Sequence, residues 1–191
     1  MSESLPARWI RGEDRSLLKT RIYSVRASKF RHPVRATEKE FFVIDPPDWA
    51  MVLPVTRAGE LVMVRQYRFG IEQLSLELPG GVVESGEDPV VAAVRELAEE
   101  TGYTGGAATW LGAVHPNPAI QSNRAHVILV PDVVRNSTPA WDDDEELSLE
   151  LVPVGDAIQQ ARTGVITHAL MLNALFLLEP WWRMRSPAGA V

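Results

Sequence analysis

Short apolar runs, several of them rich in β-branched and aromatic residues, recur along the chain up to residue 152 and predict a region dominated by β-strands. Arg57 to Glu60 separates two of these runs with a glycine-containing segment and predicts a hairpin turn. The expected strands cover residues 21–27, 40–44, 50–56, 61–67, 107–114, 125–130 and 147–152.

Helix signals surround residues 89–101. Asp88 suits the N-cap, Pro89 suits the first helical position, and Gly102 suits the left-handed conformation that ends a helix. An apolar stripe on this helix is expected to pack on a sheet, on the side away from its acidic residues. The stripe comprises Val90, Val94, Leu97 and Ala98.

Two further helices are predicted near the end of the chain. The first covers about 155–162 and stops at Gly164, and the second follows a cap at Thr167. Its apolar part, Ala169 to Leu178, contains Asn173 and is about half as long as a membrane span, so we expect a buried helix and no membrane association. Strands before and after a central helix, followed by more helices, predict an α/β (α+β) fold with a mixed sheet between helices.

Composition excludes several function classes. A length of 191 residues suits one sizeable domain with a small appendage, and a net charge of −6 argues against general nucleic-acid binding, which favours clustered Lys and Arg. The chain has no cysteine, which excludes disulfides, thiolate catalysis and Cys-ligated zinc. Residues 1–18 carry charges throughout and predict no secretory signal, so a cytoplasmic location is expected.

Three carboxylates lie on one stripe of the helix predicted over 89–101. Glu96 is one turn from Glu100 and beside Glu99, because residues three and four apart share a helix face. Carboxylates crowded in this way repel one another unless a hard cation lies among them, so the stripe predicts a Mg²⁺ or Mn²⁺ site. The alternative is a solvated acidic helix face.

The segment around this stripe resembles the Nudix box. That motif requires a glycine, five residues, a glutamate, seven residues, and then Arg-Glu-hydrophobic-any-Glu-Glu-any-Gly-hydrophobic. A pattern with so many fixed positions is far more specific than a lone glycine-rich loop. The matching residues are Gly81, Glu87, Arg95, Glu96, Leu97, Glu99, Glu100, Gly102 and Tyr103.

The resemblance implies an architecture. We expect a Nudix-type α/β/α sandwich with a mixed sheet over residues 46–180, preceded by a small N-terminal antiparallel β-sheet in residues 1–45 and followed by a tail at 181–191. Similar chains in the sugar-nucleotide branch of the family pair two subunits through such an N-terminal sheet. A homodimer is therefore expected.

The resemblance also implies roles for the box residues. The expected metal ligands are Glu96, Glu99, Glu100 and the backbone carbonyl of Gly80. The expected supporting residues are Gly81, Glu87 and Arg95. Arg95 and Glu87 would form a salt bridge that orients the glutamates, because unsupported ligands bind metal poorly. The alternative for this pair is an ordinary surface ion pair.

The general base is expected in the acidic run Asp142 to Glu146, just before the last strand, where similar chains carry it. Alignment backward from Leu147 assigns Glu145 to a metal-contacting position and Asp143 or Glu146 to the base position. Glu99 is a further candidate catalytic group. The alternative is a solvated acidic run without a catalytic role.

Residues outside the Nudix box indicate the class of substrate. Gln66-Tyr67-Arg68, Glu77-Leu78-Pro79-Gly80-Gly81 and Pro118 resemble the ADP-ribose and sugar-nucleotide pyrophosphatases. Arg68, Glu77 and Pro118 are the expected substrate contacts, although Arg68 would equally suit a salt bridge at a strand end. The turn after Pro118 lacks the acid that ADP-ribose enzymes often carry, and Arg124 is expected to bind a phosphate or sugar hydroxyl, or to pair with the acidic loop.

These features predict hydrolysis of the pyrophosphate bond of a nucleoside diphosphate sugar, ADP-ribose or similar, with a divalent metal ion as cofactor. The products would be a nucleoside monophosphate and a sugar phosphate. An alternative within the family is hydrolysis of nucleoside triphosphates or dinucleoside polyphosphates. An alternative of another class is a non-catalytic regulator that binds a nucleotide sugar, although the complete box argues for turnover.

Overall fold

The structure, a computed structural model, describes residues 5–141 and 146–185. The chain divides into two compact units. One consists of Met1–Pro47 and Asn117–Asn123, and the other consists of Asp48–Pro116 and Arg124–Val191.

The first unit is an antiparallel sheet of three strands in the order β1-β2-β3. The strands are β1 (Ile10–Lys19), β2 (Ser24–Arg31) and β3 (Glu38–Asp45). The segment Asn117–Asn123 joins this sheet at β3, where the backbone N–H of Ile44 donates to the carbonyl of Ile120 at 2.8 Å. β1 was not among the predicted strands, because its sequence IRGEDRSLLK does not alternate cleanly between apolar and polar positions.

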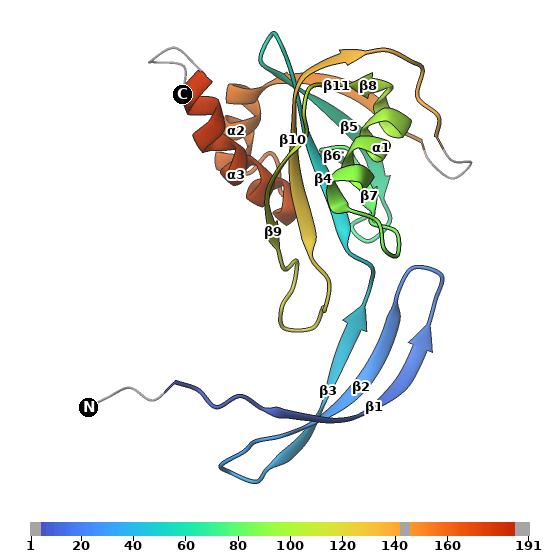
Figure 1. Cartoon of the computed structure of the whole chain (residues 1–191), viewed down its shortest axis with the longest axis vertical. Helices are drawn as coiled ribbons and strands as arrows, with labels where there is room; N and C mark the ends of the chain where they lie inside the picture. The colour runs from blue at the N-terminus through green and yellow to red at the C-terminus, as the bar shows by residue number, and fades with distance from the viewer. Residues whose placement is uncertain (1–4, 142–145, 186–191) are drawn as a thin grey trace. The chain divides into compact units, whose positions relative to one another are not determined.

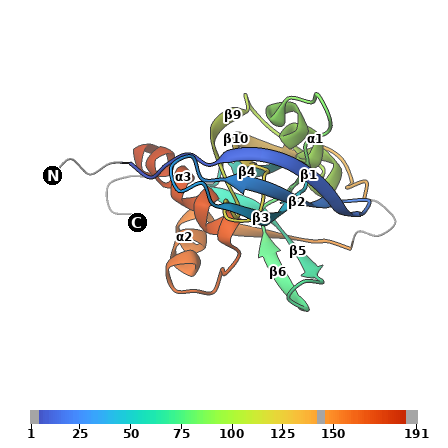
Figure 2. The same cartoon turned by 90° about the horizontal axis from the view of Figure 1, so that it is seen from below.

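The second unit contains an eight-stranded mixed sheet with helices on both faces. The path of the sheet is β11-β5-β4-β10-β8, with β6, β7 and β9 added to β5, β4 and β10, and β4 runs parallel to β10. Figures 1 and 2 show α1 on one face of this sheet and α2 and α3 on the other. The strands are β4 (Trp49–Thr56), β5 (Glu60–Arg68), β6 (Gln73–Glu77), β7 (Gly80–Val82), β8 (Tyr103–Thr104), β9 (Thr109–Val114), β10 (Ala125–Arg135) and β11 (Ser148–Pro153), and the helices are α1 (Pro89–Thr101), α2 (Val154–Arg162) and α3 (Ala169–Arg185). The predicted α/β fold with a mixed sheet between helices is confirmed.

Hydrophobic side chains fill both faces of this sheet. Because successive strand residues point to opposite faces, Leu53 of β4 packs with α2 and α3, whereas the neighbouring Val52 packs with α1. Trp182 of α3 packs against the hydrophobic cluster that contains Leu53. α3 continues to Arg185 although it contains Pro180, so residues 181–185, which were expected in a tail, are helical. Within the described residues, no helix combines the length and the apolar character needed to cross a membrane.

A fork in the sheet determines where the functional residues lie. β4 and β5 form the predicted hairpin but pair only at Val55 and Leu61. Farther from the turn, the chain of residues 73–82 lies between these two strands, pairing first with β5 as β6 and then with β4 as β7. The link from β6 to β7 thereby ends at Gly80 beside α1, where the backbone N–H of Gly80 contacts Glu100.

α1 has the predicted ends. The Asp88 side chain accepts a hydrogen bond from the backbone N–H of Val90 at 2.7 Å, Pro89 lies in the first turn, and Gly102 ends the helix with a φ of 71°. These local signals were sufficient because a helix end is decided largely by its own residues.

The predicted apolar stripe of α1 is wrong in part. Val94 is exposed, whereas Ala92 and Ala93 are buried together with Leu97. Glu100, expected on the outward acidic face, is buried as well. The physical reason is that the face of α1 with Ala93 and Leu97 packs on β4 and β10, and that Gly80 at the start of β7 donates its backbone N–H to Glu100.

Candidate functional site

The β6–β7 link meets α1 at Gly80 and Glu100. The backbone N–H of Gly80 donates to Oε2 of Glu100 at 2.9 Å, and Glu100 is 5% exposed. This hydrogen bond offsets part of the desolvation cost of the carboxylate and fixes its orientation. Gly80 has a φ of +154°, and a Cβ at this position would lie 2.1 Å from the carbonyl oxygen of Ala50. The link can approach β4 this closely only with glycine here.

Gly81 leaves room for Glu96. A Cβ built on Gly81 would lie 2.4 to 2.7 Å from the three carboxyl atoms of Glu96. The carboxylate therefore occupies the space that any other side chain at position 81 would fill. Gly80 thus binds Glu100 through its backbone N–H, and Gly81 leaves space for the carboxylate of Glu96.

Arg95 links the remaining box acids. Its Nε and Nη2 donate to the two carboxylate oxygens of Glu87 at 3.1 and 3.2 Å, and its Nη1 donates to Glu96 at 2.8 Å and to Glu99 at 3.1 Å. The hydrogen bond with Glu87 is the main cause of the raised pKa of Arg95, and the same bond is the main cause of the lowered pKa of Glu87. One permanent positive charge thus lies among three carboxylates and reduces their mutual repulsion.

The donor set of α1 suits Mg²⁺ or Mn²⁺, because these hard cations prefer carboxylate and carbonyl oxygens. Within residues 5–141 and 146–185, no group of three or more His, Asp or Glu side chains is arranged to hold a metal ion. Glu96 and Glu99 are instead turned toward Arg95. Binding of an ion at this place would require them to exchange part of their contact with Arg95 for the cation.

An ion pair between the half-exposed Arg68 and the buried Glu77 lies just before the β6–β7 link. Nε and Nη2 of Arg68 donate to the two carboxylate oxygens of Glu77 at 2.9 and 2.5 Å, and the Glu77 side chain is 4% exposed. Burial, the largest single influence, raises the pKa of Glu77, but Arg68, Ser75 and His168 together outweigh it and hold this pKa below its ordinary value. The salt bridge considered as an alternative for Arg68 is therefore present. It is compatible with a substrate contact, because the Arg68 side chain remains 45% exposed.

The contribution of Glu77 to stability is expected to depend on pH. A carboxyl group whose pKa is lowered by folding stabilises the folded chain above its ordinary pKa of 4.5, and this contribution is lost as the pH falls through the lowered value. The difference in Tm between the wild-type chain and Glu77→Gln should therefore be largest near neutral pH and shrink below pH 4.5. Circular dichroism melts across this range measure it.

A matched control for this experiment is Glu13→Gln, which changes an exposed residue of β1. Its Tm difference from wild type should stay small and show no comparable pH dependence. A Glu77→Gln difference that is equally large at neutral pH and at about pH 3 would contradict the assigned direction of the pKa shift.

The predicted acidic loop is described only in part. Asp143 and Glu145 lie outside the described residues, and Glu146 is exposed. The chain enters this loop beside the box helix, because the indole N–H of Trp141 donates to the backbone carbonyl of Glu100 at 2.8 Å. The acidic run therefore begins one residue after a side chain that is anchored on α1.

The two remaining predicted substrate contacts lie in different units. Pro118 belongs to the Asn117–Asn123 segment of the first unit, and its contact with substrate stays a prediction. Arg124 belongs to the second unit, where its backbone N–H donates to Asp48 at 2.7 Å and its carbonyl accepts from the backbone N–H of Trp49 at 2.9 Å. Its backbone is thus fixed while its side chain is exposed.

Ser75 and His168 influence Glu77 but were not predicted as site residues. Ser75 is two residues before Glu77 and so lies on the same face of β6, a spacing that could have identified it. Nε2 of His168 is 3.9 Å from the Glu77 carboxylate. His168 reaches this position from the start of α3, and no local spacing in the sequence connects these two distant residues.

Comparison with known proteins places this chain among characterised relatives. The model of the NUDIX domain family matches residues 46–175. An ADP-ribose pyrophosphatase of Bacillus subtilis is 32% identical over 76% of this chain and 78% of its own length, and a methanol dehydrogenase activator of Bacillus methanolicus is 32% identical over 87% and 93%. The crystal structure of an ADP compounds hydrolase superposes with a TM-score of 0.83 over the whole of both chains, at 22% identity.

Proposed function

The chain belongs to the Nudix family, and on this premise we propose that it hydrolyses the pyrophosphate bond of a nucleoside diphosphate sugar, ADP-ribose or a similar compound. The products are a nucleoside monophosphate and a sugar phosphate. The observation that carries the proposal is the packing of Gly80 and Gly81 against Glu100 and Glu96, with Arg68 just before this link. The name of the Bacillus subtilis relative, an ADP-ribose pyrophosphatase, supports the substrate class.

The proposed cofactor is Mg²⁺ or Mn²⁺. When bound, such an ion neutralises charge on the diphosphate oxygens and lowers the pKa of a coordinated water. The residues that would hold it are Glu96, Glu99, Glu100, the backbone carbonyl of Gly80, and Glu145. Arg95 would keep two of these glutamates oriented, and Glu87 would in turn hold Arg95, as supporting residues around a metal site commonly do.

The proposed reaction is attack of water on one phosphorus atom of the diphosphate. A new P–O bond forms, the bridging P–O bond breaks, and the leaving phosphate keeps the electron pair. One carboxylate of Asp143, Glu145 or Glu146 accepts the proton of the water, with Glu99 as the further candidate. The anchoring of Trp141 on α1 supports this assignment, because Trp141 immediately precedes the acidic run in the sequence.

We propose Arg68, Arg124 and Pro118 as substrate contacts. Arg68 donates hydrogen bonds to a phosphate oxygen through a guanidinium that Glu77 holds in place. Arg124 binds a phosphate or a sugar hydroxyl through its exposed side chain. Pro118 belongs to the other unit, and its contact with the substrate stays a prediction from the sequence.

A substrate panel tests the proposed function. Release of monophosphate is measured with ADP-ribose, GDP-mannose, UDP-glucose, diadenosine polyphosphates and nucleoside triphosphates, each with and without Mg²⁺. We expect the highest kcat/KM with one of the nucleotide sugars and no turnover after removal of the metal ion. A preference for triphosphates or dinucleoside polyphosphates would support the alternative hydrolase activity within the family. No turnover of any compound would support a non-catalytic regulator that binds a nucleotide sugar.

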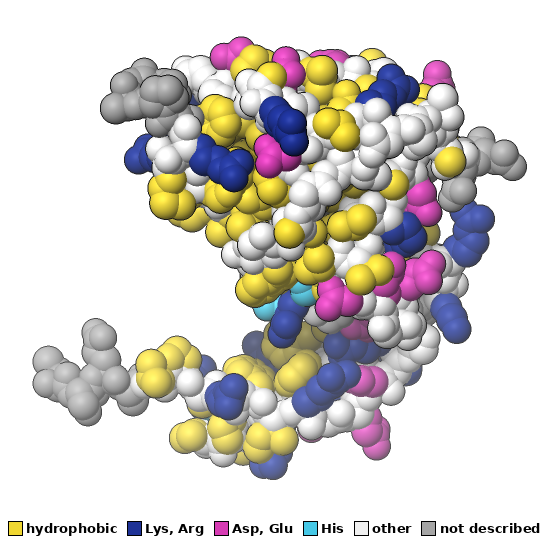
Figure 3. Space-filling view, turned by 45° about the horizontal axis from the view of Figure 1, so that its top comes forward, with side chains coloured by type: hydrophobic (Ala, Val, Ile, Leu, Met, Phe, Trp, Pro, Cys, Tyr) yellow, Lys and Arg dark blue, Asp and Glu magenta, His cyan; other side chains and the backbone are white. Residues whose placement is uncertain are grey.

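We also propose that the first unit pairs two copies of this chain. β1 is exposed along its whole length, and an isolated sheet of three strands gains stability by covering an apolar face. Figure 3 shows hydrophobic side chains of this unit at its surface among Lys and Arg. The exposed apolar residues of this unit include Trp9, Ile10, Leu17, Leu18, Phe41 and Phe42.

Light scattering coupled to size exclusion is expected to give a mass near twice 21.2 kDa. Phe42→Glu should shift the mass toward 21.2 kDa, because it places a charge in the proposed contact, whereas Val165→Glu, an exposed change in the second unit, should not. A monomeric wild-type chain at micromolar concentration would contradict the proposal.

A further inference from the structure

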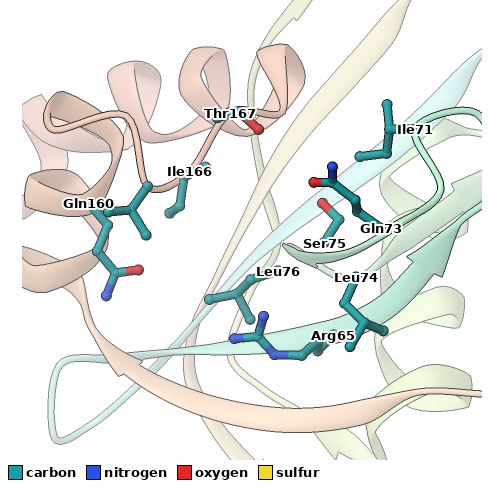
Figure 4. A pocket seen from close by; sticks show the side chains of 10 residues that line it. Arg65, Ile71, Gln73, Leu74, Ser75, Leu76, Gln160, Ile166 and Thr167 are labelled. Carbon is teal, nitrogen blue, oxygen red and sulfur yellow. The ribbon is translucent and has the colours of Figure 1, made fainter.

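A pocket of about 240 Å³ lies in the second unit, between the β5–β6 hairpin and the connection from α2 to α3. Figure 4 shows Gln160 and Ile166 on the helical side of this pocket and Arg65, Ser75 and Leu76 on the side of the sheet. None of these residues belongs to the metal, catalytic or substrate set assigned above. Protein pockets of roughly 300–1,000 Å³ hold drug-sized ligands, so this smaller space suits one part of a nucleotide sugar and not the whole compound.

The polar lining suits a ligand that carries several hydroxyl groups. The side-chain amides of Gln73 and Gln160 and the hydroxyl groups of Ser75 and Thr167 both donate and accept hydrogen bonds. A sugar hydroxyl needs partners of both kinds. The apolar walls, such as Leu76 and Ile166, suit the C–H face of a sugar ring.

Arg65 adds a positive charge to the same pocket. Its Nε donates to Glu150 at 2.5 Å, and this is the single side-chain hydrogen bond of Arg65 within residues 5–141 and 146–185. The terminal nitrogens of the guanidinium are therefore available to a ligand. A planar guanidinium binds phosphate oxygens well, so the lining as a whole fits a phosphorylated sugar.

Ser75 connects the pocket to the ion pair beside the box. It lines the pocket, and it lies on the same face of β6 as Glu77, with which it interacts. Thr167, on the opposite wall, precedes His168, whose Nε2 is 3.9 Å from the Glu77 carboxylate. Glu77 holds Arg68, the proposed phosphate contact. A pocket residue, Ser75, thus interacts with the buried carboxylate that positions Arg68.

We propose that this pocket binds a sugar phosphate unit. The proposal rests on the proposed function, because hydrolysis of a nucleoside diphosphate sugar releases such a unit. Two sources share this chemistry, the sugar end of the bound substrate and free sugar phosphate. Both would contact Gln73, Gln160 and Arg65.

Isothermal titration calorimetry with ribose 5-phosphate tests the pocket directly. The test variant is Gln160→Leu, which removes the side-chain amide and keeps the backbone carbonyl that accepts the Val165 N–H at 2.9 Å. Loss of one or two hydrogen bonds should raise the Kd about 5- to 10-fold. The control is Gln159→Leu, an exposed change of the same residue type in the same helix, which should leave the Kd unchanged. Absence of binding to the wild-type chain, or equal Kd values in all three proteins, overturns the proposal.

The kcat/KM for ADP-ribose identifies the source of the sugar phosphate. A 5- to 10-fold loss in Gln160→Leu alone, together with the weaker ribose 5-phosphate binding, assigns the pocket to the sugar end of the substrate. Weaker ribose 5-phosphate binding with an unchanged kcat/KM assigns it to free sugar phosphate. If the wild-type chain hydrolyses no nucleotide sugar, the proposed function fails, and the calorimetric comparison still decides whether the pocket binds a sugar phosphate.

Discussion

Replacement of Glu100 by Gln is expected to lower kcat for the preferred nucleotide sugar by at least about 100-fold while the chain still folds. Glu100 is buried and accepts a hydrogen bond from the backbone N–H of Gly80 at 2.9 Å. Gln has nearly the same shape, and its carbonyl oxygen can accept the same bond. The negative charge is lost, and with it the ability to stabilise a divalent cation beside the diphosphate.

Two measurements separate this effect from misfolding. The Tm of Glu100→Gln should stay close to that of the wild-type chain, and its affinity for Mn²⁺, measured by electron paramagnetic resonance, should fall together with kcat. The control is Glu84→Gln, which makes the same change at an exposed position of the loop before α1 and should alter neither value. Wild-type turnover and wild-type Mn²⁺ affinity in Glu100→Gln would remove Glu100 from the metal site.

Gly80→Ala is expected to lower the free energy of unfolding by about 3–5 kcal/mol, from backbone strain and overpacking combined. A Cβ at this position would lie 2.1 Å from the carbonyl oxygen of Ala50 and 3.0 Å from the Cα of Met51. Both atoms belong to the backbone of β4, which is buried and cannot yield locally. The link would have to move away from β4, and its hydrogen bond to Glu100 would be lost as well.

Urea titration of Gly80→Ala measures this cost, and two other glycines provide comparisons. Gly86 has a φ of +83° with open space around it, so Gly86→Ala should cost only about 1–2 kcal/mol of strain. At Gly81 the added Cβ would meet the carboxylate of Glu96, the mobile end of a side chain. Gly81→Ala should therefore be milder than Gly80→Ala in stability while still disturbing the metal site. Equal midpoints for Gly80→Ala and Gly86→Ala would refute the steric argument.

The box helix was predictable because its determinants are local. Asp88, Pro89 and Gly102 act on the residues next to them, and each has the expected position in α1. The hairpin between β4 and β5 was predictable for the same reason, since Gly59 adopts a φ of +81° within its own turn. Contacts between residues close in sequence leave a pattern that can be recognised without the fold.

Other features depended on contacts between distant segments. The exposure of Val94 and the burial of Glu100 follow from the packing of α1 on β4, β7 and β10, which the helical periodicity of α1 alone does not contain. His168 comes close to Glu77 only because α3 begins beside β6. The anchoring of Trp141 on the carbonyl of Glu100 likewise joins residues far apart in the chain.

The sequence by itself determined the ends of α1, the stripe of glutamates on it, and the fold class, because capping residues, helical spacing and apolar periodicity act over a few neighbouring positions. The tertiary structure alone decided that Gly80 binds Glu100 and that the partner of Arg68 is a buried Glu77. These contacts arise because β4 and β5 separate after a single pair, and the chain between them carries the β6–β7 link to the box helix. The register of such a fork is set by packing over the whole sheet, which no short stretch of sequence encodes.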